Sequence, residues 1–157
     1  MTAGGSSLPE VQRLLAVLAS GRRCAETGTA FGEGAAAIAS TAASLVTVES
    51  DSERAEIARA RLDGIANVEL LVGDWRELMP AHAPFEFLFF DAGRLEESPE
   101  VFDLLGPGGI FVKDDLTPGR PVETDPVRAL LFGHPHLVAV EVLTTSGTAA
   151  VIATKRG

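Results

Sequence analysis

The chain has 157 residues, 46% of them apolar, and its 13 basic and 22 acidic side chains leave a formal charge of −9. This size and apolar content suit one domain over residues 1–157 with a core of its own. We expect no nucleic-acid partner, because affinity for a phosphate backbone depends on clustered Lys and Arg. The single cysteine, Cys24, excludes a disulfide within the chain. With no signal-peptide pattern and no membrane-spanning run, the sequence predicts a cytoplasmic protein with no membrane partner.

Helical and strand patterns alternate along nearly the whole chain. Serines followed by glutamate three residues later, at Ser7–Glu10 and Ser50–Glu53, predict capping boxes that begin helices. The predicted helices lie within residues 1–21 and at Gly34–Ala43, Ser50–Asp63, Trp75–Met79, Pro99–Leu105 and Asp125–Phe132. The predicted strands are Arg23–Thr27, Leu45–Glu49, Val68–Val72, Phe85–Phe90, Gly109–Lys113, Leu137–Leu143 and Ala149–Thr154.

This alternation predicts an α/β, Rossmann-like fold with a doubly wound sheet. Residues 22–154 are expected to form its core, and the N-terminal helix precedes them. Phe85–Phe90 is too apolar to be half exposed and is expected to be a central buried strand. Ser146-Gly147 is typical of a hairpin turn and adds one antiparallel strand at the end. Ligands bind at the carboxyl ends of the strands in such sheets, whereas all three histidines fall at the opposite edge, which argues against a catalytic histidine.

A glycine-rich segment, Gly28–Gly34, follows the first strand. Glycines there let a ligand approach the backbone, although the spacing is not that of dinucleotide-binding loops. Glu49 ends the second strand, 21 residues after Gly28, where an acid can accept hydrogen bonds from a ribose diol. The other interpretation of Glu49 is an acid favoured by the dipole of the following helix.

Several motifs resemble those of class I S-adenosylmethionine-dependent methyltransferases. They are Ala25–Gly34, Val48–Asp51, Gly73-Asp74-Trp75, Phe89–Ala92, and Leu105–Gly109 leading to Lys113-Asp114-Asp115. Together they are most similar to the catechol and caffeoyl-CoA type of O-methyltransferase, and they extend over nearly the whole chain. The resemblance implies seven strands in the order 3-2-1-4-5-7-6, with the last strand antiparallel.

The resemblance also implies where S-adenosylmethionine would bind. Its methionine end would lie among Glu26, Gly28, Thr29 and Gly32, and its ribose at Glu49 with the adjoining Ser50. Asp74 and Trp75 would contact the adenine, although Trp75 as a plain core residue is an equal alternative. Asp91 would lie nearest the sulfonium and the acceptor.

Members of the resembled family bind a divalent cation through acids after strands four and five. The corresponding residues here are Asp91, Asp114 and Asp115, whose oxygens suit Mg²⁺ or a similar cation; the alternative is that Asp114 and Asp115 merely end a strand. The family's lysine base corresponds to Arg94, which stays protonated and would bind an anion or stabilise developing charge. Gly34 replaces the family's serine at the cofactor carboxylate, so backbone N–H groups would have to serve there.

The leading hypothesis is therefore methyl transfer to a hydroxyl of a small-molecule acceptor, with or without help from a metal. A second hypothesis is a methyltransferase-like protein that binds the cofactor without turnover, and a nicotinamide oxidoreductase is a third. Relatives of this type are often dimers, so a homodimer is also expected.

Overall fold

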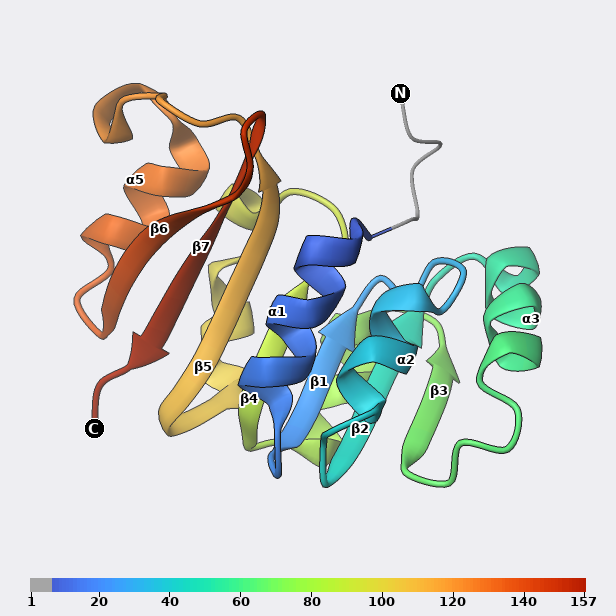
Figure 1. The fold of residues 1–157 in the computed structure, drawn as a ribbon. Coiled ribbons are helices and arrows are strands. Elements are labelled where there is room, and N and C mark those ends of the chain that lie inside the picture. Colours follow the sequence, from blue (N-terminus) through green and yellow to red (C-terminus); the bar gives the residue numbers. More distant parts are fainter. Residues whose placement is uncertain (1–6) are drawn as a thin grey trace.

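A seven-stranded sheet forms the centre of the molecule in the computed structural model, which describes residues 7–157 (Figure 1). Its strands are β1 (Arg23–Thr27), β2 (Ser44–Glu49), β3 (Val68–Val72), β4 (Phe85–Phe90), β5 (Leu105–Leu116), β6 (Leu137–Thr145) and β7 (Thr148–Lys155). They lie in the order β3-β2-β1-β4-β5-β7-β6, and only β7 runs antiparallel to its neighbours within this sheet. The predicted fold and strand order are confirmed.

Helices cover both faces of the sheet. The α-helices are α1 (Pro9–Ala19), α2 (Glu33–Ala39), α3 (Ser52–Arg61), α4 (Trp75–Leu78) and α5 (Pro126–Gly133). Short 3₁₀ helices are η1 (Met79–His82), η2 (Leu95–Glu97), η3 (Pro99–Leu104) and η4 (Val122–Thr124). In Figure 1, α1 and α2 lie in front of the sheet and α5 lies behind it, as parallel strands with right-handed crossovers require.

Strand β4 divides the core into two layers. Phe87 and Phe89 pack into the cluster with α1 and α2, whereas Leu88 and Phe90 pack into the cluster on the other face. All four side chains are fully buried, because successive strand residues point to opposite faces and both faces are covered. The prediction of a central buried strand at these residues is confirmed, and each buried phenylalanine contributes about 1.5–3 kcal/mol of hydrophobic free energy.

Both predicted capping boxes are wrong. The N-cap of α1 is Leu8, which makes no side-chain capping bond. The N-cap of α3 is Asp51, and its Oδ1 accepts hydrogen bonds from the backbone N–H groups of Glu53 (2.9 Å) and Arg54 (3.0 Å). A carboxylate caps as well as a serine does and also favours the positive end of the helix, so Asp51 replaces Ser50 as the cap.

Other element bounds differ from the predicted ones. Pro99–Leu104 is a 3₁₀ helix, and β5 continues to Leu116, so Asp114 and Asp115 belong to the strand and do not follow it. No helix within residues 7–157 is long and apolar enough to cross a membrane. The cytoplasmic location and the homodimer stay predictions.

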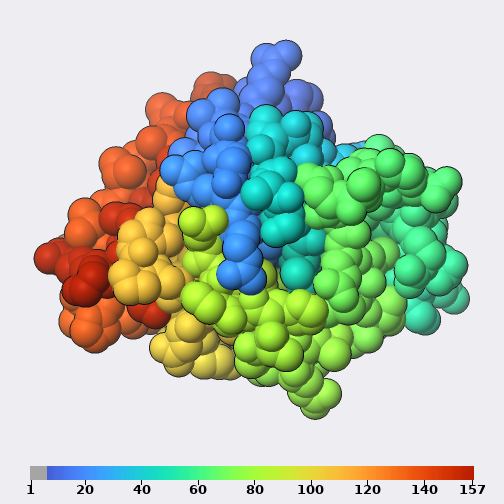
Figure 2. Space-filling model, turned by 90° about the horizontal axis from the view of Figure 1, so that it is seen from below, coloured from blue at the N-terminus to red at the C-terminus, as the bar shows by residue number. Residues whose placement is uncertain are grey.

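Figure 2 shows the amino edge of the sheet, where the starts of β1, β4 and β5 meet. His82 precedes β4, and His134 and His136 precede β6, so all three histidines belong to this edge. The polar residues discussed below lie at the opposite edge, beyond the carboxyl ends of the parallel strands.

Candidate functional site

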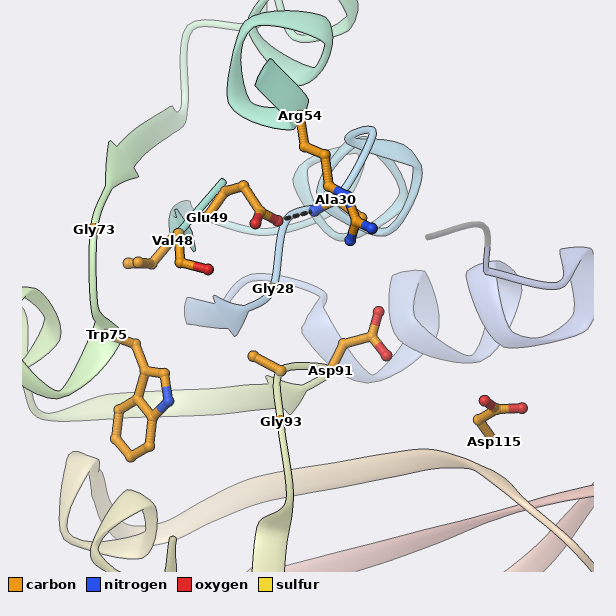
Figure 3. Close-up of a pocket in the computed structure, with 12 residues that line it drawn as sticks. Gly28, Ala30, Val48, Glu49, Arg54, Gly73, Trp75, Asp91, Gly93 and Asp115 are labelled. Atoms are coloured by element: carbon orange, nitrogen blue, oxygen red, sulfur yellow. Dashed lines mark hydrogen bonds between the residues drawn. The ribbon is translucent and has the colours of Figure 1, made fainter. Parts of the chain in front are cut away.

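A pocket of about 390 Å³ opens at the carboxyl ends of the central strands. Its wall comes from the last residues of β2 and β5 and from the segments that follow β1, β2, β3 and β4. It includes Gly28, Ala30, Glu49, Trp75, Asp91 and Asp115 (Figure 3). A second hollow of about 450 Å³ adjoins it and shares Ser50 and Trp75 with it. We call these the main pocket and the side hollow.

The β1–α2 loop passes very close to the end of β4 at Gly28. A Cβ atom on Gly28 would lie 2.8 Å from the carbonyl oxygen of Asp91, and its φ of +83° also favours glycine. The backbone N–H groups of Gly28 and Thr29 both donate to the carbonyl oxygen of Val48, at 2.8 and 3.1 Å. Glycine is therefore required here so that three strand ends can converge on the pocket floor.

Glu49 joins two loops at the pocket wall. Its Oε2 accepts from the backbone N–H of Ala30 at 2.7 Å, and its Oε1 accepts from that of Asp51 at 3.0 Å (Figure 3). The residue is 6% exposed. A carboxylate has about four acceptor positions, so two remain for a ligand after these two bonds.

A buried chain of hydrogen bonds lies beneath the loop. The hydroxyl of Thr47 donates to Oε1 of Glu26 at 2.6 Å and is 2.6 Å from the hydroxyl of Thr29. Burial raises the pKa of Glu26 well above its usual value, against the lowering effect of the Thr47 bond. A Cβ on Gly34 would lie 2.5 Å from Oε2 of Glu26, so a side chain there would displace the Glu26 carboxyl group. Glu26 and Thr29 thus support the loop from below and do not line the main pocket.

Trp75 and Asp74 lie at the far end of the site. Trp75 lines both hollows, yet it is only 6% exposed and packs edge-on against Phe90 with 6.1 Å between ring centres. It is therefore a core residue that also lines the pocket, and its contact with adenine stays a prediction. Asp74 lines the side hollow and caps α4, its Oδ1 accepting from the backbone N–H of Arg76 at 2.9 Å.

Asp91 presents its carboxyl group to the main pocket from the end of β4 (Figure 3). Partial removal from water, followed by the charge of Asp114, raises its pKa to about 7, while Lys113 opposes the rise. Asp114 is 7% exposed, and its Oδ1 has no hydrogen-bond partner among residues 7–157. Burial also raises the pKa of Asp114. Two neighbouring carboxyl groups at this edge thus resist ionisation, and of the two Asp91 lines the main pocket.

The predicted metal site is not supported. No group of three His, Cys, Asp or Glu side chains in the described part of the chain is arranged to hold a metal ion. Because β5 runs on through Asp114 and Asp115, these neighbours differ in surroundings: the first is buried, whereas the second is exposed and lines the main pocket with a φ of +60°.

Arg94, predicted to act in catalysis, lies on the rim of the side hollow. Its guanidinium forms ion pairs with Glu96 (3.0 Å) and Glu97 (2.7 Å), and its side chain is 66% exposed. It does not line the main pocket.

Sequence reasoning missed Arg54, which lines the main pocket from the first turn of α3. Its position could have been predicted from the topology, because the first turn of the helix that follows β2 lies at the carboxyl edge of the sheet.

The strand order and the pocket at this edge are those of the class I S-adenosylmethionine-dependent methyltransferases. The O-methyltransferase TomG from Streptomyces achromogenes, solved in complex with S-adenosylmethionine, has a similar structure, with a TM-score of 0.74 and 26% identity over 100% of this chain and 84% of that one. A methyltransferase from Geobacter sulfurreducens shares the fold with a TM-score of 0.79 at 18% identity, covering 96% of this chain and 80% of that one.

Sequence comparison defines the family more closely. The family model for protein-L-isoaspartate(D-aspartate) O-methyltransferase matches residues 8–114, and the chain belongs to this family. A protein-L-isoaspartate O-methyltransferase of Rhodopseudomonas palustris is 37% identical over 97 residues, 60% of this chain and 45% of that protein. One from Koribacter versatilis is 33% identical over 106 residues, 65% of this chain and 48% of that protein. The chain thus spans about half the length of these curated relatives.

These matches correct two predictions. The expected small-molecule acceptor is wrong, because the family and the curated relatives are named for methylation of protein L-isoaspartate. The matches also support the class I methyltransferases in general and not the catechol and caffeoyl-CoA type. That type shares the fold and the cofactor motifs, which is why the motifs alone pointed to it.

Proposed function

We propose that this chain transfers a methyl group from S-adenosylmethionine to the free α-carboxylate of an L-isoaspartyl residue in a protein. The observation that carries the proposal is the extent of the family match, because residues 8–114 include every pocket residue named above except Asp115. The part of the chain that resembles the family is therefore the part that builds the pocket.

The residues present fit S-adenosylmethionine. The main pocket and the side hollow have the volumes usual for small-molecule sites, and they are continuous at Trp75. The indole of Trp75 and the carboxylate of Asp74 would contact the adenine, and the free acceptor positions of Glu49 would hold the ribose hydroxyls. Asp91 would lie nearest the sulfonium, whose positive charge favours the ionised carboxylate.

An isoaspartyl acceptor agrees with the residues at the site. A carboxylic acid with a pKa near 4 is already ionised at neutral pH, so it attacks the methyl group without a general base. The reaction therefore needs no base at position 94, where Arg94 cannot accept a proton. The chain's contribution is to hold donor and acceptor in line and close together, which alone can supply about 7–11 kcal/mol of the barrier reduction.

The first test measures binding and transfer separately. Calorimetric titration with S-adenosylhomocysteine measures cofactor binding, and labelled S-adenosylmethionine measures transfer to a peptide with one isoaspartyl residue and to its normal aspartyl isomer. We expect binding, and base-labile label on the isoaspartyl peptide alone. Glu49→Gln should weaken binding about tenfold or more, because it removes charge-assisted bonds to the ribose, while Glu53→Gln on the exposed side of α3 should not.

Two results would contradict the proposal. Failure to bind S-adenosylhomocysteine would remove the cofactor assignment. Binding without transfer to any isoaspartyl peptide would instead indicate a protein that holds the cofactor without turnover.

A further inference from the structure

The main pocket has one basic side chain in its wall among the residues that the structure describes, Arg54. The other ionisable side chains in the wall are the acids Glu49, Asp91 and Asp115. Within residues 7–157, Arg54 forms no ion pair, and its guanidinium carbon lies 5.9 Å from the centre of the Phe31 ring. Figure 3 shows its side chain extending from α3 towards Ala30. An unpaired cation in an acidic pocket is suited to an anionic part of the ligand.

Four backbone N–H groups of the glycine-rich loop are already used within the fold and do not bind such an anion. The N–H groups of Gly28 and Thr29 donate to Val48, that of Gly32 donates to Thr29, and that of Ala30 donates to Glu49. Helix α2 has only seven residues, so its dipole contributes little.

Position 34 has no side chain to supply the contact, and a Cβ there would lie 2.5 Å from Oε2 of Glu26. A charged side-chain donor for an anion beside this loop comes instead from α3, which places Arg54 in the pocket wall.

S-adenosylmethionine has a single anionic group, the α-carboxylate of its methionine part. We propose that Arg54 binds this carboxylate, an inference that rests on the proposed function. Two features prepare the guanidinium for this contact. The backbone N–H of Arg54 is held by the Asp51 cap at 3.0 Å, which fixes the first turn of α3. The ring of Phe31 lies beneath the guanidinium, which favours a cation at this place.

The test compares two ligands that differ in the amino-acid tail, which carries the carboxylate that Arg54 would bind. S-adenosylhomocysteine carries the amino-acid tail, and 5′-methylthioadenosine has the same adenosine thioether without it. We expect Arg54→Gln to weaken S-adenosylhomocysteine at least tenfold, since a hydrogen bond to a charged group contributes about 1.5–3 kcal/mol. Its affinity for 5′-methylthioadenosine should stay within twofold of the original.

Two further variants complete the design. Arg54→Lys keeps the charge but not the planar pair of donors, so it should restore part of the lost affinity. Arg59→Gln removes a cation from the same helix that pairs with Glu56 and does not line the main pocket, so it should change neither affinity.

The outcomes separate this inference from the proposed function. If the unmodified chain does not bind S-adenosylhomocysteine, the proposed function fails and this inference fails with it. If the chain binds and Arg54→Gln has no effect, or weakens both ligands equally, only the role of Arg54 is overturned.

Discussion

Ala30 occupies a backbone conformation that alanine seldom adopts. Its φ is +50°, and in this conformation its N–H reaches Oε2 of Glu49. The left-handed region costs a residue with a Cβ about 1–2 kcal/mol, whereas glycine enters it without that cost. The bond to Glu49 thus holds a strained residue in the pocket wall.

Replacing Ala30 by glycine should therefore stabilise the fold. The strain energy relieved in the folded state exceeds the entropic cost of the more flexible unfolded chain. We therefore expect the free energy of unfolding, measured by urea titration, to rise by about 0.5 kcal/mol. The matched control is Ala37→Gly inside α2, which should lose about 1 kcal/mol. Equal losses in both variants would show that Ala30 is not strained.

Asp91 should make stability depend on pH. Its pKa is raised from 3.8 to about 7, so between these values the folded state holds a proton that the unfolded state releases. The stability associated with this group is therefore fully present below pH 4 and is lost as the pH rises through 7. At pH 8 we expect the free energy of unfolding of Asp91→Asn to exceed that of the unmodified chain by about 1 kcal/mol. The difference is no larger because solvent around this exposed residue screens most of the pKa shift. The two should converge at pH 4.

Thermal unfolding from pH 4 to pH 8 measures this difference. Asp103→Asn, at an exposed position on η3, serves as the control. A gap between Asp91→Asn and the unmodified chain that does not grow with pH would contradict the raised pKa.

A buried arginine joins the loop after β5, helix α5 and strand β6. Arg128 of α5 is fully buried and donates to Asp125 (2.8 Å), to both carboxylate oxygens of Glu141 on β6, and to the carbonyl oxygen of Thr117 (2.8 Å). The guanidinium therefore fixes the loop after β5, the start of α5 and the middle of β6 with one planar group.

Arg128→Met should lower the free energy of unfolding by about 3 kcal/mol. The methionine fills a similar volume but leaves Asp125 and Glu141 without a cation, and breaking a buried ion pair on one side carries this cost. Chemical denaturation measures the change. The control is Arg120→Met, at an exposed position of the same loop, whose free energy of unfolding should stay within about 0.5 kcal/mol of that of the unmodified chain. A similarly small effect of Arg128→Met would show that the network adds little to stability.

Sequence patterns located the strands better than the helix ends. The predicted bounds of β1, β3 and β4 match the structure residue for residue, because runs of apolar and β-branched side chains are bounded by glycine, proline or polar residues. The first turn of α3 was misassigned, since Ser50, Asp51 and Ser52 can all cap a helix and the backbone path decides which one does. The end of β5 was missed because Asp114 and Asp115 are poor strand formers whose place is set by pairing between β5 and β7.

At the scale of the whole molecule, the alternation of elements was enough to predict the layered fold and the edge that carries the site, whereas the strand order came from the resemblance to the methyltransferases. Connections between parallel strands are right-handed and place the loops after the strands at one edge, so Gly28, Glu49, Trp75 and Asp91 were certain to meet there once the strands were located. The acceptor class was not predictable in this way, because the cofactor half of the site is shared by many methyltransferases and differences in substrate arise in variable loops.

The sequence by itself thus determined the order of the elements and the residues that gather at the carboxyl edge, because both follow from hydrophobic periodicity and chain direction. Only the tertiary structure decided what each of those residues does. It placed Glu26 beneath the loop and Arg54 in the pocket wall, and it separated the surroundings of Asp114 and Asp115. These outcomes depend on close packing and backbone conformation over distances of a few ångströms, which residue spacing along the chain does not specify.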